Sequence, residues 1–296
     1  MPNAPFYLDS QLAYFGGFKR EYADAEFALF GVPFDCTSSY RPGSRFGPNA
    51  IREASSNIET WSWRTGIDFE DVKVHDLGNL AVVYGDAAET IRRVADTVED
   101  INSTRKVPVM MGGEHLVTLG SAKALKDCTF ISFDAHFDLR DEYLSNKLSH
   151  ACVMKRIIEE GGKDRVIPCG VRATFGEEVK WVKENGIRYL TSRDLLREGV
   201  NSSSLWLKEQ IKDAGKIYIS IDMDVIDPAY ASGVGNPEPE GITPSLLLDI
   251  LADLIDDRVV GFDLVEVAPP YDNGNTAILA AKMISEVCMM IKQAWR

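Results

Sequence analysis

Residues 129–138 read Thr-Phe-Ile-Ser-Phe-Asp-Ala-His-Phe-Asp, an apolar run that passes directly into two acids and a histidine. Residues 216–228 follow the same pattern, because Lys-Ile-Tyr-Ile-Ser-Ile is followed by Asp-Met-Asp-Val-Ile-Asp-Pro. Short apolar runs rich in β-branched and aromatic residues are typical of buried strands in a parallel sheet. Open α/β sheets bind their ligands at the carboxyl ends of such strands. Carboxylates crowded at that edge repel one another unless cations hold them together, so the two stretches predict a metal site.

Strand-like runs alternate with amphipathic helical stretches along the rest of the chain. The predicted strands are Phe27–Gly31, Val72–Asp76, Val107–Met111, Thr129–Phe133, Val166–Gly170, Ile187–Leu190, Ile217–Ile221 and Val259–Glu266. The predicted helices include Ala87–Ile101, Val153–Glu160, Glu177–Asn185, Pro244–Ile255 and Thr276–Gln293. This alternation implies right-handed crossovers, a mainly parallel sheet and helices on both faces. Since no repeat or linker interrupts it, we expect a single three-layer domain over residues 1–296.

Composition excludes several classes of protein. The 296 residues are 45% hydrophobic and 26% charged, which fits neither a disordered chain nor a membrane protein. The net charge of −13 argues against a nucleic-acid partner, because phosphate binding needs clustered Lys and Arg. Residues Met1–Pro5 show no signal peptide, and no apolar run reaches the roughly 20 residues that span a bilayer. Five cysteines without Cys-x-x-Cys spacing are typical of reduced thiols, so we expect a cytoplasmic protein.

Two of the four histidines are candidate metal ligands. His75 has the surroundings of an ordinary structural residue, whereas His115 follows two glycines and His136 lies among acids. The acids at the two strand ends are Asp134, Asp138, Asp222 and Asp224. Mixed imidazole and carboxylate ligands suit Mn²⁺, Zn²⁺, Fe²⁺ or Co²⁺. Two histidines and four aspartates exceed one tetrahedral zinc site, so a pair of ions bridged by carboxylate accommodates them better.

Three motifs resemble, in order and spacing, the metal-binding motifs of the ureohydrolases, the family of arginase, agmatinase and their relatives. They are Gly112-Gly113-Glu114-His115, Asp134-Ala135-His136-Phe137-Asp138 and Ser220-Ile221-Asp222-Met223-Asp224-Val225-Ile226-Asp227-Pro228. The similarity covers nearly the whole chain, from Gly31-Val32-Pro33-Phe34-Asp35 to Val265-Glu266-Val267-Ala268-Pro269-Pro270-Tyr271-Asp272. The resemblance implies a three-layer α/β/α fold with a parallel eight-stranded sheet, in agreement with the number of predicted strands. It also implies a homo-oligomer, a trimer or a hexamer.

The resemblance implies ligands for two Mn²⁺ ions per chain. The residues similar to the ligands of one ion are His115, Asp134, Asp138 and Asp222. Those similar to the ligands of the other are Asp134, His136, Asp222 and Asp224, so that Asp134 and Asp222 bridge the ions. Asp227, which precedes Pro228, is expected to shape the turn instead. Such a pair of ions lowers the pKa of water and supplies a nucleophile for the guanidinium carbon, a poor electrophile.

Three side chains are expected to act on the substrate. Asp138 is expected to carry a proton to the leaving amine in addition to binding metal. His150 resembles the family's histidine that shuttles protons or positions substrate at the cavity mouth, although Ala151 follows it where many relatives have glycine. Glu266 resembles the glutamate that pairs with the substrate's guanidinium, a contact in which a planar fork meets a carboxylate.

The substrate is expected to be agmatine, a small cationic guanidine that would be cleaved to putrescine and urea in polyamine biosynthesis. Residues 268–272 resemble the agmatinase branch, and no Asn follows Asp138 where arginases bind the carboxylate of their substrate. Asp141 or Glu142 could receive a terminal ammonium, whereas Arg140 could attract a carboxylate, so arginine or another guanidino acid is the alternative.

Two other classes of function are open. A single-zinc deacetylase shares the family's fold, but the two pairs of acids, Asp134 with Asp138 and Asp222 with Asp224, argue against it together with His115. A metal-binding protein without catalysis is the other class, and the presence of all six expected ligands argues against that. Val234 and Asn236 stand where common relatives carry threonines, so substrate contacts from that loop are not carried over.

Overall fold

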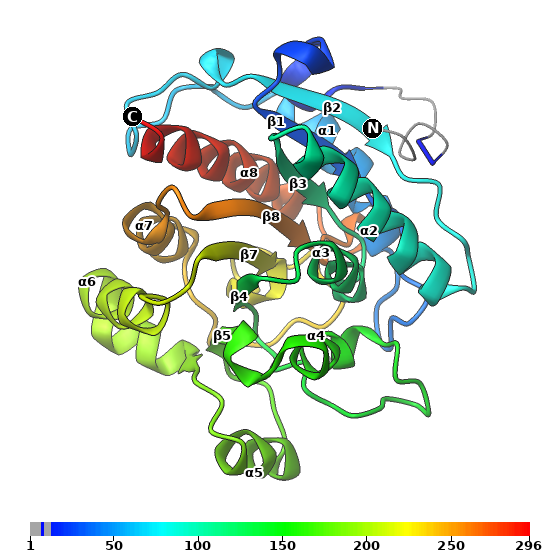
Figure 1. Ribbon diagram of the computed structural model, residues 1–296, viewed down its shortest axis with the longest axis vertical. Coiled ribbons are helices and arrows are strands. Elements are labelled where there is room, and N and C mark those ends of the chain that lie inside the picture. The colour runs from blue at the N-terminus through cyan, green and yellow to red at the C-terminus, as the bar shows by residue number, and fades with distance from the viewer. Residues whose placement is uncertain (1–6, 9–12) are drawn as a thin grey trace.

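A central parallel sheet organises the computed structural model, which describes residues 7–8 and 13–296. Within these residues the sheet has eight strands in the order β2-β1-β3-β8-β7-β4-β5-β6, and each neighbouring pair runs parallel (Figure 1). The strands are β1 (Phe27–Gly31), β2 (Val74–Asn79), β3 (Val107–Met111), β4 (Cys128–Phe133), β5 (Val166–Val171), β6 (Leu190–Thr191), β7 (Lys216–Asp222) and β8 (Val259–Val265). The stretch Met1–Pro5, on which the expectation about a signal peptide rests, lies outside the described residues.

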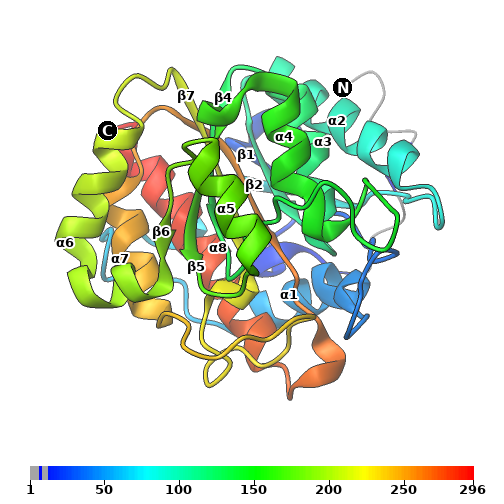
Figure 2. The same ribbon diagram turned by 90° about the horizontal axis from the view of Figure 1, so that it is seen from below.

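Helices cover both faces of this sheet (Figures 1 and 2). The α-helices are α1 (Gly47–Ser55), α2 (Ala87–Ser103), α3 (Thr118–Ala124), α4 (Val153–Gly161), α5 (Gly176–Glu184), α6 (Ser192–Gln210), α7 (Pro244–Leu254) and α8 (Asn275–Ala294). Helices α1, α6, α7 and α8 share one apolar core with the sheet, and α2, α3, α4 and α5 share the other. The expected three-layer α/β/α fold with a parallel eight-stranded sheet is therefore confirmed.

The apolar strands follow from burial on both faces of the sheet. Along β1, Phe27 and Leu29 belong to one core, whereas Ala28 and Phe30 belong to the other. Side chains of a strand alternate between faces, so a strand covered on both sides needs an uninterrupted apolar run. Burial of a side chain such as Phe or Leu contributes about 1.5–3 kcal/mol, which makes these runs the main stabilising element of the sheet.

Two predicted strands differ from the observed ones by more than one residue at an end. Strand β2 begins at Val74, where it pairs with Phe27 of β1, and not at Val72. The prediction of a strand over Ile187–Leu190 is wrong, because β6 consists of Leu190–Thr191 at the edge of the sheet. Its few residues are half-buried, and their strand conformation comes from pairing with β5 and not from a local apolar pattern.

Among the described residues, no helix combines the length and the apolar character needed to cross a bilayer. All five cysteines are free, as their spacing predicts.

Candidate metal centre

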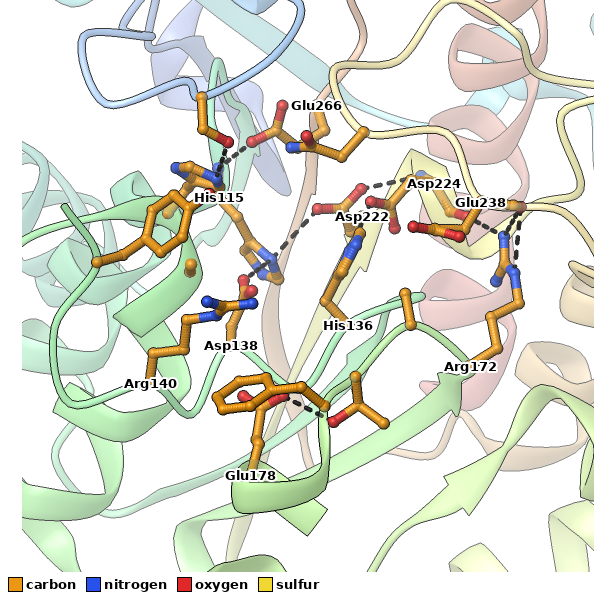
Figure 3. A pocket seen from close by; sticks show the side chains of 18 residues that line it. His115, His136, Asp138, Arg140, Arg172, Glu178, Asp222, Asp224, Glu238 and Glu266 are labelled. Carbon is orange, nitrogen blue, oxygen red and sulfur yellow. Dashed lines mark hydrogen bonds and ion pairs between the residues drawn. The ribbon is translucent and has the colours of Figure 1, made fainter.

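The candidate residues follow the strands at the centre of the sheet. Asp134 comes directly after β4, Asp222 ends β7 and Glu266 comes directly after β8. His115 opens η6 (His115–Val117), a 3-10 turn that begins four residues beyond the end of β3 and continues into α3. Because β3, β8, β7 and β4 are neighbours, residues separated by up to about half of the chain meet at one edge (Figure 3).

Gly113 allows the loop after β3 to pass close to the loop after β1. A Cβ at Gly113 would lie 2.0 Å from the carbonyl oxygen of Phe34, far inside contact distance. The backbone N–H of Glu114 donates to that same oxygen at 2.7 Å, and Glu266 donates its backbone N–H to the carbonyl of Gly113 at 2.8 Å. These bonds place His115 beside Glu266, whose Oε1 accepts the backbone N–H of His115 at 2.8 Å.

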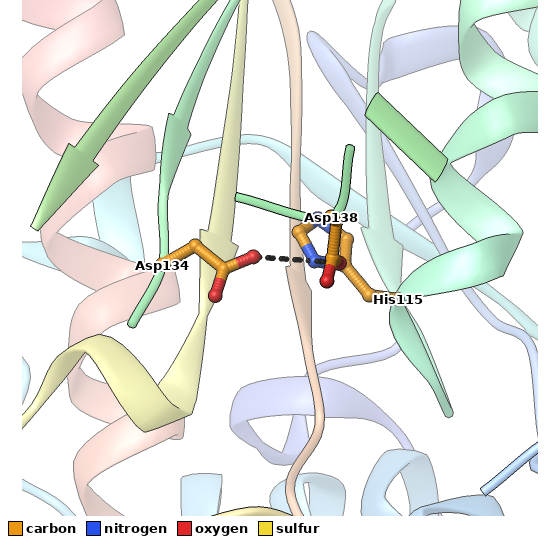
Figure 4. Close-up of side chains that lie close together, drawn as sticks. All are labelled: His115, Asp134 and Asp138. Carbon is orange, nitrogen blue, oxygen red and sulfur yellow. Dashed lines mark ion pairs between the residues drawn. The ribbon is translucent and has the colours of Figure 1, made fainter. Parts of the chain in front are cut away.

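The inner group of candidate ligands surrounds Nδ1 of His115. This nitrogen lies 2.9 Å from Oδ2 of Asp134 and 3.1 Å from Oδ2 of Asp138 (Figure 4). It also lies 3.3 Å from Oδ2 of Asp222. Two atoms bonded at right angles to one ion at about 2.1 Å lie about 3 Å apart, so these separations suit ligands of a common cation. Nδ1 of His115 and Oδ2 of Asp134 are buried without a well-formed hydrogen-bond partner among the described residues, which a metal ion would supply.

The outer group is built around His136 and shares Asp134 with the inner group. Nδ1 of His136 lies 3.0 Å from Oδ2 of Asp224 and 3.5 Å from Oδ1 of Asp134. The two carboxylate oxygens of Asp134 therefore face different histidines. This arrangement fits a residue that bridges two ions.

Second contacts, meaning hydrogen bonds to the atoms of a candidate ligand that do not face the cluster, orient the ring of His115. Nε2 of His115 lies 3.0 Å from the hydroxyl of Ser220, which itself donates to Oδ1 of Asp263 at 2.6 Å. A hydroxyl that has donated its only proton must accept from Nε2–H, which leaves a lone pair on Nδ1 of His115. Ser220 thus selects the tautomer of His115 that can bind a metal ion.

In the absence of cations, the pKa values of the clustered carboxylates and histidines are strongly shifted. Burial, and then the charge of Asp134, raise the pKa of Asp138 to about 7. Burial also raises the pKa of Asp222 well above its usual range, with further contributions from Asp224 and Asp134. Burial acts to lower the pKa of His115, but the neighbouring carboxylates raise it well above the usual value. These shifts favour protonation of the metal-free cluster, and divalent cations would neutralise the same charges, so the residues fit a two-ion centre.

Two of the residues expected to act on the substrate have a left-handed backbone. The φ angles are 52° at Asp138 and 66° at Glu266. Non-glycine residues rarely adopt this conformation, which costs about 1–3 kcal/mol and is concentrated at functional sites. The strain aims both carboxylates at the same cavity, which they line together.

A cavity of about 430 Å³ opens above these residues. Its lining includes His115, His136, Asp138, His150, Asp222, Asp224 and Glu266. Asp134 lies beneath it as a buried residue. Asp227 takes no part, since its carboxylate accepts the N–H groups of Ala229 and Gly241 within its own loop, as expected of a turn-shaping residue.

Known proteins resemble the chain over most of its length. A model of the arginase family matches residues 25–290. The chain belongs to the arginase family. A solved agmatine ureohydrolase of Thermoplasma volcanium superposes with a TM-score of 0.87 at 37% identity and covers 93% of both chains. An N(1)-aminopropylagmatine ureohydrolase of Thermococcus kodakarensis is 37% identical over 88% of both chains. A mitochondrial guanidino acid hydrolase of Homo sapiens is also 37% identical, over 88% of this chain and 76% of its own. The expected likeness to ureohydrolases is thereby confirmed.

The acids that closely follow Asp138 in sequence do not line the cavity. The structure does not bring Asp141 or Glu142 into the lining, because both are exposed and Asp141 pairs with Arg156 and Lys147. Besides the candidate ligands and Glu266, the acids that line the cavity are Glu178 and Glu238. Glu178 lies across the pocket from Glu266 (Figure 3). Sequence reasoning overlooked Glu178, although it stands four residues before Val182 on the buried face of a helix.

Arg172 is another residue of this arginase-family site that sequence reasoning overlooked. It lies one residue beyond β5, so the strand-end criterion applied to Asp134 would have found it. Its guanidinium donates to the carbonyls of Asp224 at 2.6 Å, Glu238 at 2.8 Å and Pro239 at 3.0 Å. Arg172 thereby ties the turn that carries Asp224 to the loop that closes the cavity.

Proposed function

We propose that this protein is a binuclear-manganese agmatinase that hydrolyses agmatine to putrescine and urea. Its family makes it a ureohydrolase, an enzyme that acts on guanidino C–N bonds. The observation that carries the proposal is the convergence of two histidine nitrogens on a shared Asp134 beneath an open cavity. The proposed ligands of the inner ion are His115, Asp134, Asp138 and Asp222, and those of the outer ion are Asp134, His136, Asp222 and Asp224.

Metal ions bound by these residues would supply a water-derived nucleophile near neutral pH. Glu266 is proposed to accept the guanidinium of the substrate and to hold its planar carbon over the ligands. Burial, and then the charge of Glu114, raise the pKa of Glu266 well above its usual range, and a bound guanidinium would reverse this by neutralising the carboxylate.

Two further residues are proposed to move protons. Asp138 lines the cavity beside the other proposed ligands, so its carboxylate is placed to take a proton from the water-derived nucleophile and pass it to the leaving amine. His150 lines the cavity, is buried, and is proposed to exchange protons with the departing product.

The charge of the cavity favours a cationic substrate. Acids predominate among the charged groups of the lining, and the guanidinium of Arg172 is already bonded to backbone carbonyls. Glu178 is proposed to receive the terminal ammonium of agmatine, because it lies across the pocket from Glu266 (Figure 3). Its carboxylate accepts from Leu139 N–H and from the hydroxyl of Thr174, which keeps lone pairs available for an ammonium.

A second candidate substrate is a guanidino acid, and the position of Arg140 favours it. The Arg140 guanidinium lies between the rings of Tyr143 and Phe175, 4.7 and 4.5 Å from their centroids. It makes no hydrogen bond or ion pair with the residues that the structure describes, and it lines the cavity. Its free donors would suit a carboxylate at the distal end of the substrate.

Parallel steady-state assays of urea release from agmatine, 4-guanidinobutyrate and arginine test the proposal after reconstitution with Mn²⁺. We expect the highest kcat/KM for agmatine, and an increase of at least about tenfold in KM for agmatine in Glu178→Gln. Arg140→Ala is the matched variant and should leave agmatine turnover within about threefold, since no carboxylate is lost. If kcat/KM is higher for guanidinobutyrate, and Arg140→Ala abolishes that preference, the substrate is a guanidino acid and not agmatine.

Three further expectations remain predictions. We propose that residues 1–296 form a single ureohydrolase domain, that the chain assembles as a homo-oligomer, a trimer or a hexamer, and that it is cytoplasmic. Light scattering of the purified protein tests the assembly, and a mass equal to one chain of 32.8 kDa would contradict it.

A further inference from the structure

His150 is held in place by a residue with no assigned part in the reaction. Its backbone N–H donates to Oγ1 of Thr37 at 2.9 Å, and its ring Nδ1 lies 3.3 Å from the same oxygen. Thr37 belongs to the loop that follows β1, whereas His150 opens η7 (His150–Cys152), a 3-10 turn that leads into α4. One hydroxyl oxygen therefore contacts both the backbone and the ring of a histidine 113 positions away.

Glu114 orients the hydroxyl of Thr37. Oγ1 of Thr37 donates to Oε1 of Glu114 at 2.7 Å, and the backbone N–H of Thr37 donates to Oε2 at 2.7 Å. Glu114 is fully buried, and the bond from its own N–H to Phe34 fixes its backbone. An ionised carboxylate only accepts, so with Glu114 ionised the hydroxyl proton of Thr37 points to Oε1 and away from His150.

The direction of these bonds determines the tautomer of the imidazole. A threonine hydroxyl has one proton to donate and two lone pairs that accept. The proton of Thr37 goes to Glu114 and one lone pair accepts the backbone N–H of His150, so the other lone pair is left for a proton on Nδ1. The hydroxyls of Ser39 and Ser149 lie 3.4 Å from the ring nitrogens and can rotate to suit either tautomer. Thr37 alone among these hydroxyls has a fixed direction.

The tautomer decides which nitrogen can accept a proton from the reaction. Burial, and then the charge of His136, lower the pKa of His150 to about 4, so the ring is neutral near pH 7. Nε2 lies on the side of Ser39, which lines the cavity together with Tyr143. A neutral ring with its proton on Nδ1 has an accepting Nε2 at this wall.

We propose that Thr37 is a positioning residue for His150, because its hydroxyl, directed by Glu114, keeps the ring proton on Nδ1 and leaves Nε2 free to accept a proton from the cavity. The inference rests on the role of His150 in the proposed function and adds the groups that prepare this histidine for it. Neither Thr37 nor Glu114 needs to touch the substrate, and the hydroxyl of Thr37 keeps its proton throughout.

Nitrogen-15 solid-state NMR of the full-length protein, labelled at the histidine rings, tests the tautomer directly. The metal-free and the Zn²⁺-loaded protein are compared near pH 7.5, and the signals of His150 are assigned by their loss in His150→Asn. We expect a protonated Nδ1 and a bare Nε2 in the wild type and in Thr37→Ser. In Thr37→Val the acceptor is lost, so we expect a population with the proton on Nε2.

Glu114→Gln is a second variant with a sharper expectation. Its amide oxygen must accept the N–H of Thr37, so its NH₂ group donates to Oγ1 and frees the threonine proton for Nδ1. We therefore expect the proton of His150 to move to Nε2 in Glu114→Gln. Thr104→Val, which removes a hydroxyl at the C-cap of α2, is the matched control and should leave the His150 signals unchanged.

Steady-state kinetics separates a positioning role from a structural one. We expect Thr37→Val to lower kcat about tenfold with KM within about twofold, and Thr37→Ser to restore it. An unchanged Nδ1–H signal in both Thr37→Val and Glu114→Gln would overturn the inference, even if activity falls. Wild-type kcat in His150→Asn would instead remove His150 from the proposed function, while the tautomer comparison would still decide the inference about Thr37.

Discussion

His115 and His136 stand on opposite sides of the metal centre, and the protein encloses them to different degrees. The side chain of His115 is 1% exposed and contacts three carboxylates, whereas that of His136 is 28% exposed and contacts two. Ser220 and Asp263 hold the far side of the His115 ring, but no described residue bonds to Nε2 of His136. A ligand fixed by second contacts binds its ion more tightly, so we expect a firmly held inner ion and a more labile outer ion.

The largest effect is expected at the residue that the two groups share. Asp134→Ala should lose both ions and at least about 1,000-fold in kcat/KM, because without metal no strong nucleophile forms near neutral pH. Metal analysis and urea release on the same sample check this. Asp141→Ala, which removes an exposed acid paired with Arg156, is the control and should retain both ions. Two ions bound by Asp134→Ala would contradict the bridge.

The next variants separate the two groups. His136→Ala should retain about one ion per chain, whereas His115→Ala should bind the inner ion about 100-fold or more weakly, because it removes the central nitrogen of the better-enclosed group. Metal content after dialysis against a weak chelator distinguishes them. Equal retention by the two variants would mean that enclosure does not set the affinity.

A smaller effect is expected from the second contacts of the inner group. Ser220→Ala removes the hydroxyl that selects the tautomer of His115, and we expect a loss of about 10–100-fold in affinity for the inner ion. Isothermal titration should show the outer ion unchanged within about threefold. A weakened outer ion alone would reverse the assignment of the two groups.

The smallest effect concerns pH. The pKa values of both imidazoles are raised in the metal-free protein, and that of Asp138, which belongs to the inner group alone, is raised to about 7. Metal ions bind the deprotonated ligands, so binding releases protons and affinity falls as pH falls, by about tenfold per pH unit for each proton released. Titrations in buffers of different ionisation enthalpy should show more protons released at the inner site than at the outer one. Equal numbers of protons released at the two sites would contradict the expected difference between the inner and the outer group.

The sequence predicts the central strands well because their signal is local. The bounds of β1 and β3 are predicted correctly, since each is a fully buried apolar run. Helix α6 could not be predicted from periodicity, because Gly199 interrupts it with a positive φ and residues 201–204 have low helix propensity. The short β6 depends on its pairing with β5, which no local pattern reveals.

Some residues of the candidate site can be predicted from the sequence, and others cannot. The acids and histidines at strand ends are found from sequence because parallel strands bring their carboxyl ends to one edge. Glu178 reaches the cavity from α5 and not from a strand end, so the strand-end criterion does not find it. Asp141 and Glu142, which lie close to Asp138 in sequence, turn outward instead. Proximity in the chain is a weaker guide here than position on the sheet.

The measurement that tests the central claim most directly is the number of Mn²⁺ ions bound per chain in gel-filtered protein that releases urea from agmatine. We expect two ions per chain, with activity proportional to occupancy of the second, more labile site. Full activity with one ion per chain, or with a single zinc, would contradict a two-ion centre built on Asp134 and Asp222.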